Sequence, residues 1–187
     1  MALTESTMLE LGTIAPDFAL PNVMTGETVA RDDFRGNKAL LVMFICAHCP
    51  YVKHIEKTLG PLGADYASQP VGIVAISSND VATHPADSPE GLKQQALTNA
   101  FVFPYLYDES QHVAHAYMAA CTPDFFLFDS GFRLVYRGQY DSSRPGSSIP
   151  VTGVDLRAAI DLVLEGKAVP ADQHPSIGCN IKWKAAS

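Results

Sequence analysis

The chain has 187 residues, of which 47% are hydrophobic and 18% charged, a composition typical of a folded globular protein. This length suits one domain with a full hydrophobic core, and we expect a single domain over residues 1–187. The formal net charge of −7 argues against nucleic acid or an anionic membrane as a partner, because both require a basic surface.

Strand and helix patterns alternate along the chain. Strands are predicted by apolar or alternating runs at residues 15–21, 27–30, 39–45, 71–76, 104–107, 124–129 and 133–137. Helices are predicted by apolar residues at helical spacing, together with capping residues, over 51–66, 88–99, 108–117 and 152–165. Gly60-Pro61 should kink or break the first helix. The tail 170–187 has neither pattern, so we expect it to be irregular but packed on the domain.

The start of the chain carries no targeting signal. Residues 1–8 have neither the basic nor the apolar segment of a secretory signal peptide, and no apolar stretch approaches the roughly 20 residues of a membrane-spanning helix. We therefore expect a cytoplasmic protein whose residues 1–11 are flexible. In that reducing compartment, four cysteines indicate redox chemistry or metal binding rather than a static disulfide framework.

The sequence Cys46-Ala47-His48-Cys49-Pro50 lies where the buried strand predicted at 39–45 ends and the first helix begins. The free backbone N–H groups and the helix dipole at such a position favour an anion. The thiolate is an anion and is the reactive form of cysteine. This C-x-x-C motif therefore predicts a thiol redox site.

The order of the predicted elements indicates a mixed sheet with helices on both faces. The chain resembles the thioredoxin-like superfamily, in particular the branch of alkyl hydroperoxide reductases and thiol-specific antioxidants and its peroxiredoxin-like subgroup. The matching motifs are Ala15-Pro16-Asp17-Phe18, Cys46 to Val52, Thr122-Pro123, Phe126 to Asp129 with Gly131, and Gly178 to Trp183. The resemblance implies an α/β, thioredoxin-like three-layer fold, with a central mixed sheet flanked by helices, an N-terminal hairpin extension and an irregular C-terminal tail.

The resemblance also implies roles for the site residues. Cys46 would be the exposed attacking thiolate and Cys49 the buried resolving thiol. His48, when protonated, would stabilise the Cys46 thiolate together with the helix terminus. Pro123 would follow a cis peptide bond that faces the cysteines, and Thr122 would offer backbone groups to an extended substrate.

Three more residues are candidates for accessory roles. Glu56 could accept a proton, and the alternative is a solvated helix face. Cys121 adjoins the expected groove, and the alternative is a small buried hydrophobic residue. Cys179 we expect to be a structural anchor, because its apolar neighbours should hold the tail against the domain; the alternative is a third redox thiol.

We thus expect a thiol–disulfide oxidoreductase with a Cys46/Cys49 couple and no cofactor. Its partners would be protein or low-molecular-weight disulfides and a thiol or disulfide electron partner, and a homodimer is left open. The first alternative is a thiol peroxidase that reduces hydroperoxides at Cys49, with Cys46 or Cys179 resolving. The peroxidase motif would need threonine or serine at Cys46 and proline at Val42, and its arginine is missing. The second alternative is a copper or zinc chaperone, although we expect no metal.

Overall fold

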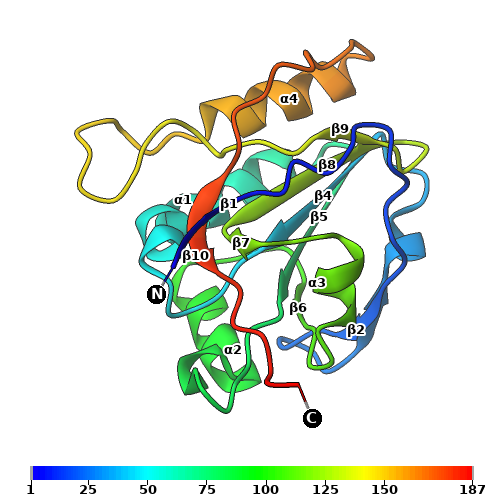
Figure 1. Cartoon of the computed structure of the whole chain (residues 1–187). Coiled ribbons are helices and arrows are strands. Elements are labelled where there is room, and N and C mark those ends of the chain that lie inside the picture. Colours follow the sequence, from blue (N-terminus) through cyan, green and yellow to red (C-terminus); the bar gives the residue numbers. More distant parts are fainter. Residues whose placement is uncertain (1, 187) are drawn as a thin grey trace.

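A five-stranded mixed sheet forms the centre of the molecule, whose computed structural model describes residues 2–186 (Figure 1). The strands lie in the order β6-β5-β4-β8-β9. Their bounds are β4 Ala39–Phe44, β5 Val71–Ser77, β6 Tyr105–Tyr107, β8 Asp124–Asp129 and β9 Leu134–Tyr136. β5 runs parallel to β4 and β6, whereas β8 is antiparallel to β4 and β9. The predicted mixed sheet is confirmed.

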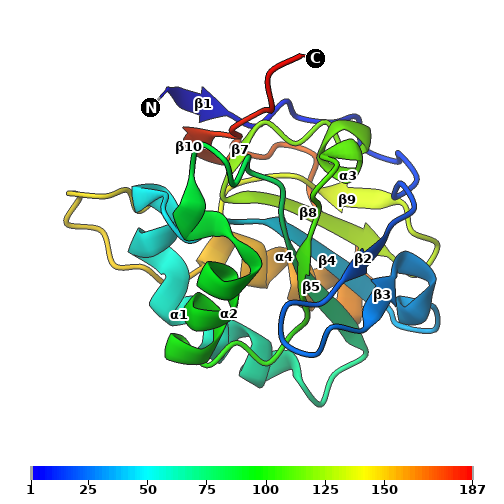
Figure 2. The same cartoon turned by 90° about the horizontal axis from the view of Figure 1, so that it is seen from below.

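Helices cover both faces of this sheet, which gives the three layers of a thioredoxin-like fold (Figure 2). They are α1 Pro50–Tyr66, α2 Pro89–Thr98, α3 His112–Ala116 and α4 Val154–Leu164, with short 3-10 turns at Arg31–Phe34 and Pro85–Asp87. Side chains of α1, α2 and α4 share one core cluster, whereas α3 and the N-terminal segment share the other. The predicted hairpin is present as β2 Ala19–Pro21 and β3 Thr28–Ala30.

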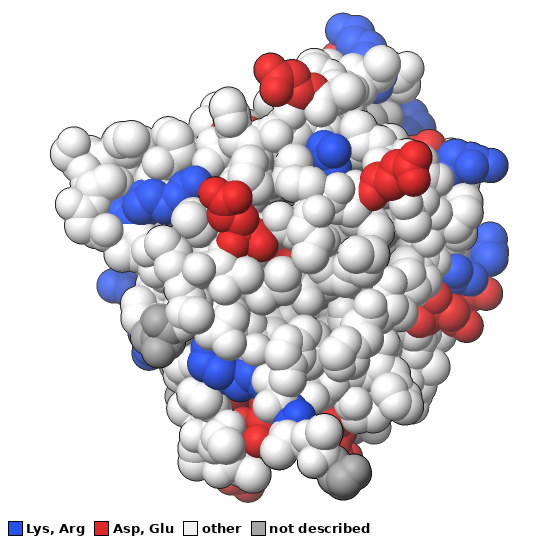
Figure 3. All heavy atoms as spheres, in the orientation of Figure 1, with Lys and Arg blue, Asp and Glu red and all other residues white. Residues whose placement is uncertain are grey.

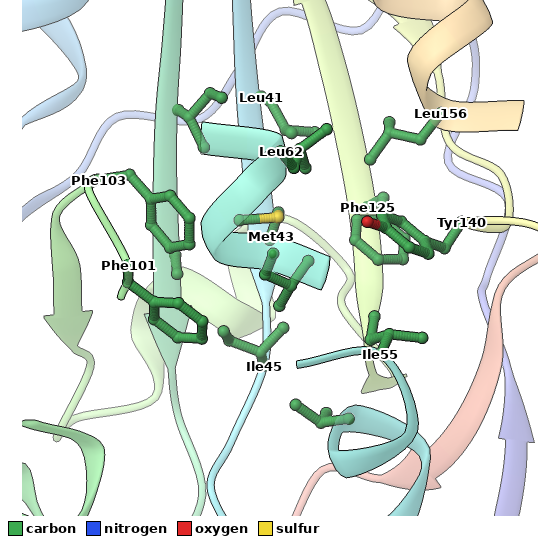
Figure 4. Packing of buried hydrophobic residues seen from close by; sticks show 14 of the residues in the cluster. Leu41, Met43, Ile45, Ile55, Leu62, Phe101, Phe103, Phe125, Tyr140 and Leu156 are labelled. Carbon is green, nitrogen blue, oxygen red and sulfur yellow. The ribbon is translucent and has the colours of Figure 1, made fainter. Parts of the chain in front are cut away.

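Strand β4 explains why residues 39–45 form an unbroken apolar run. All of its residues are buried, and alternate side chains enter the two core clusters. Leu41 and Met43 lie among Leu62 of α1, Phe125 of β8 and Leu156 of α4 (Figure 4). A strand covered on both faces has no position that favours a polar residue.

Helix α1 continues through Pro61 to Tyr66, so of the kink or break predicted at Gly60-Pro61 the break is wrong. A proline inside a helix removes one backbone hydrogen bond, but the buried side chains of Leu59 and Leu62 hold the flanking turns against the sheet. Gly60 has a different role. A Cβ at this position would lie 2.2 Å from the carbonyl oxygen of Asn99, so glycine allows the helix to pack closely against the end of α2.

The C-terminal tail is not wholly irregular, which corrects the prediction. Residues Ile177–Asn180 form β10, which lies between β1 (Leu3–Glu5) and β7 (Cys121–Thr122) in a small antiparallel sheet (Figure 1). The same sheet gives residues 3–5 a fixed place, against the expected flexibility of residues 1–11; Met1 lies outside the described residues. Residues 3–5 and 177–180 are thereby held in one small sheet with β7, the strand that precedes β8.

On the face seen in Figure 3, basic and acidic residues lie interspersed, without a broad continuous basic area. Over residues 2–186, no helix combines the length and the hydrophobicity required to cross a lipid bilayer.

Candidate active site

The C-x-x-C motif lies at the turn between β4 and α1, as predicted, with Cys49 at the N-cap of the helix. Cys46 is a free thiol, but its expected exposure is wrong, since both cysteines have 0% exposed surface. Its sulfur lies 3.4 Å from Thr122 Oγ1, and its carbonyl oxygen accepts a hydrogen bond from Gln95 Nε2 at 2.9 Å. Neighbours from distant parts of the chain therefore cover the thiol.

Cys49 forms a disulfide with Cys179, with 6.3 Å between their Cα atoms. The bond ties Cys179 to a cysteine of the motif, a contact that the expectation of a structural anchor did not include. Strand β10 pairs with β7 so that Cys179 stands directly opposite Thr122, and this register carries its sulfur to the start of α1. Because 130 residues separate the two cysteines in sequence, no local pattern reveals this pairing.

Thr122 lies beside three of the four cysteines, namely Cys46, Cys49 and Cys179. The peptide bond between Thr122 and Pro123 is cis, and Thr122 is buried. The Thr122 hydroxyl faces the Cys46 sulfur, and its carbonyl oxygen lies 3.4 Å from the Cys49 sulfur. Cys179 is its partner across the strand pair. One residue of β7 thus contacts both cysteines of the motif and is paired with the third.

The side chain of His48 is held by Asp87, a residue that the sequence analysis did not identify. His48 Nδ1 hydrogen-bonds Asp87 Oδ2. The other carboxylate oxygen of Asp87 accepts the backbone N–H groups of Ala47 (2.7 Å) and His48 (3.1 Å). Asn79 Nδ2 also donates to Asp87 Oδ2 at 2.9 Å. Asp87, with no exposed surface, therefore fixes the turn that carries His48.

Charges in this site favour a protonated His48. The hydrogen bond to Asp87, and then the interaction with Cys46, raise the pKa of His48 to about 9. Burial works against ionisation of Asp87, but the hydrogen bonds from His48 and Asn79 outweigh it and lower the pKa of this carboxyl. His48 also packs against the His84 ring, with 4.6 Å between the ring centroids. At neutral pH the pair is an imidazolium and a carboxylate, and the imidazolium lies near the Cys46 sulfur.

Glu56 is half-buried rather than on a solvated helix face, and its contact with the site is indirect. Its carboxylate accepts a hydrogen bond from Gln95 Nε2 (2.9 Å), the same nitrogen that binds the carbonyl oxygen of Cys46. The hydroxyl of Tyr105 donates to Gln95 Oε1 at 2.8 Å. Gln95, which the sequence analysis missed, therefore links α1, α2 and β6 behind Cys46.

Cys121 is buried and free, with its sulfur 3.5 Å from the carbonyl oxygen of Pro123. Burial, and then the nearby Asp124 carboxyl, raise the pKa of this thiol far above its usual value, so Cys121 stays protonated and unreactive. Burial likewise raises the pKa of Asp124 to about 7, against the backbone hydrogen bonds that favour its ionised form.

A metal ion fits this site poorly. Among the described residues, Cys46, His48 and Asp87 form a group whose ligand atoms lie within 4.8 Å of one another. However, both Asp87 oxygens already accept two hydrogen bonds each. Cys49 cannot bind a metal as a thiolate, because its sulfur is in the disulfide with Cys179. A carboxylate with four donors has no free lone pair for a metal. This group is better suited to hold a thiolate than a metal.

A family comparison identifies the chemistry to which this arrangement belongs. The model of the AhpC/TSA family matches residues 11–137, which include the C-x-x-C motif and Pro123. The chain belongs to the AhpC/TSA family. This membership makes the protein an oxidoreductase on the thioredoxin-like fold, as the sequence motifs implied.

Two solved structures are similar over the whole chain. An uncharacterized conserved protein from Geobacillus kaustophilus is 53% identical, with a TM-score of 0.97 and coverage of 100% of this chain and 99% of that one. A hypothetical protein from Sinorhizobium meliloti 1021 is 50% identical, with a TM-score of 0.96 and coverage of 98% and 100%.

More distant likeness concerns the fold alone. The thioredoxin domain of a thiol-disulfide oxidoreductase from Bacteroides vulgatus is 20% identical, with a TM-score of 0.59, and covers 69% of this chain and 88% of that one. None of the curated proteins matches the chain.

Proposed function

We propose that this thiol–disulfide oxidoreductase passes one disulfide among Cys46, Cys49 and Cys179. The observation that carries the proposal is the convergence on Thr122: it contacts Cys46 and Cys49 and is paired with Cys179. Cys49 is the central cysteine, because it is bonded to Cys179 and follows Cys46 in the same C-x-x-C motif.

The proposed reaction starts with the reduced protein. The Cys46 thiolate, stabilised by the start of α1 and by protonated His48, attacks a substrate disulfide and releases one substrate thiol. The Cys49 thiolate then attacks Cys46 in the mixed disulfide, which forms a Cys46–Cys49 disulfide and releases the second substrate thiol. Finally the Cys179 thiolate attacks Cys49, which breaks the Cys46–Cys49 bond, releases the Cys46 thiolate and forms the Cys49–Cys179 disulfide. One substrate disulfide is reduced to two thiols, and the protein is oxidised by two electrons.

Cysteine variants test this order with hydroxyethyl disulfide as substrate. Cys46→Ser should abolish its reduction, Cys49→Ser should retain a mixed disulfide on Cys46, and Cys179→Ser should stop at Cys46–Cys49. Peptide mapping identifies each bond, and Cys121→Ala is the matched control because Cys121 is buried and outside the relay. Full activity of Cys46→Ser, or a mixed disulfide on Cys49 in the wild type, would contradict the proposed roles.

A thiol peroxidase is the second candidate, and one contact favours it. The peroxidase hydroxyl that is absent from the C-x-x-C segment is supplied by Thr122, whose Oγ1 lies 3.4 Å from the Cys46 sulfur. In this version Cys46 attacks a hydroperoxide, an alcohol or water leaves, and Cys49 condenses with the sulfenic acid to release water. Dithiothreitol-dependent consumption of hydrogen peroxide measures this activity, and Thr122→Val should reduce it more than it reduces exchange with hydroxyethyl disulfide.

A further inference from the structure

Strand β10 occupies the sheet edge through which an extended peptide would reach the active-site sulfurs. Cys179 is paired with Thr122, and Asn180 with Cys121, so β10 occupies the backbone hydrogen-bonding groups on this edge of β7. The other edge of β10 is paired with residues 3–5 of β1. Within the described residues, both edges of β10 are therefore paired.

The Cys49–Cys179 disulfide shows how an extended strand beside β7 brings a half-cystine to this site. To bond Cys49, Cys179 sits in an extended strand antiparallel to β7. The chain is closely packed at this point, because a Cβ on Gly178 would lie 2.0 Å from the carbonyl oxygen of Thr122. A peptide with ordinary side chains could not take this place without shifting the cis-proline turn.

Both ends of β10 are also tied to the domain. Before the strand, Ser176 Oγ donates a hydrogen bond to the carbonyl oxygen of Pro123 at 2.6 Å. After it, the backbone N–H of Ile181 binds the carbonyl oxygen of Ala120 (3.1 Å), and that of Lys182 binds Asn79 Oδ1 (2.8 Å). A strand that belongs to the same chain competes with any external peptide at high effective concentration.

We propose that the substrate accepted from solution is a low-molecular-weight disulfide and that β10 excludes the disulfides of proteins. This inference rests on the thiol–disulfide exchange proposed above. A small disulfide needs only side-chain movement at the partly exposed turn Ala47–His48, whereas a peptide must displace β10.

Single-turnover oxidation of the reduced protein tests the inference with hydroxyethyl disulfide and with insulin. Each rate constant is divided by that of the same substrate with free dithiothreitol, which removes intrinsic reactivity. We expect the normalised rate with insulin to be about 100-fold lower, because several backbone hydrogen bonds must open before a peptide can bind. Equal normalised rates would overturn the inference. Absence of reaction with both substrates would instead overturn the proposed function on which it rests.

A matched pair of glycine variants identifies the excluding element. Gly178→Ala forces β10 away from Thr122, whereas at Gly131 an added Cβ has only an ordinary contact at 3.5 Å. We expect Gly178→Ala to reduce the discrimination against insulin at least about tenfold and Gly131→Ala to leave it unchanged. Unchanged discrimination in a folded Gly178→Ala protein would overturn the role of β10. If that variant does not fold, the wild-type ratio of normalised rates decides.

Discussion

The ring of His48 hydrogen-bonds the carboxylate of Asp87, a residue 39 positions further along the chain. The same carboxylate binds the backbone of the turn between the two motif cysteines, so it fixes the position of the ring as well as its charge. Asp87 has no exposed surface of its own. It is a positioning residue that acts on Cys46 through His48.

His48→Ala should slow alkylation of Cys46 by iodoacetamide about tenfold at pH 7, because the positive charge beside the attacking sulfur is lost. The oxidised protein suits this measurement, since its only free cysteines among the described residues are Cys46 and the unreactive Cys121. The exposed His112→Ala is the control. An unchanged rate and pH profile in His48→Ala would show that His48 only forms part of the turn and does not affect the reactivity of Cys46.

Asp87→Asn should lower the pKa of His48 from about 9 towards its ordinary value of 6.5. Because the folded-state pKa is raised, the pair stabilises the fold fully below pH 6.5, and this contribution is lost as pH rises through about 9. NMR titration of the His48 ring gives the pKa, and unfolding between pH 6 and pH 10 gives the stability. The exposed salt-bridge variant Asp65→Asn should change neither. A His48 pKa still near 9 in Asp87→Asn would contradict the assignment.

The sequence predicted those parts of the site that depend on local patterns. The buried run at 39–45, followed by a helix, placed Cys46 and Cys49 at a strand-to-helix turn, and the structure has them there. Ser88 was predicted to begin a helix, and its hydroxyl accepts a hydrogen bond from the backbone N–H of Gly91. Each of these features is encoded within a few residues of itself.

Features that depend on distant pairing could not be predicted. Asp87 lies at the end of a polar loop and gives no local sign that it contacts His48. The pairing of β10 with β7 brings Cys179 to Cys49, yet the four residues of β10 show no strand pattern of their own. The thioredoxin-like resemblance implied an exposed Cys46, but this cysteine is buried, with Thr122 and Gln95 from distant parts of the chain as its partners.

Cys121→Ala should leave exchange with hydroxyethyl disulfide within about twofold of the wild type, because the buried thiol stays protonated. The free energy of unfolding should fall by about 1–2 kcal/mol, since the substitution leaves a small cavity beside Pro123 and Asp124. Enzyme assay and denaturant unfolding separate the two effects. A large loss of exchange in a protein that remains folded would make Cys121 a fourth member of the relay.

Asp124 should make the protein less stable as pH rises from about 4 to about 7. Burial raises its pKa from 3.8 to about 7, so in this range the folded state holds a proton that the unfolded state has lost. The full difference corresponds to about 4 kcal/mol, which is reached above pH 7. Asp124→Asn should remove this decline, whereas the exposed control Asp172→Asn should retain it. Denaturant unfolding of the three proteins between pH 4.5 and pH 8 measures the slopes. Parallel curves for wild type and Asp124→Asn would show that the carboxyl is already ionised inside the fold. In that case its burial is compensated by the side chain of Ser6 and by the backbone N–H groups of residues 120, 121 and 125.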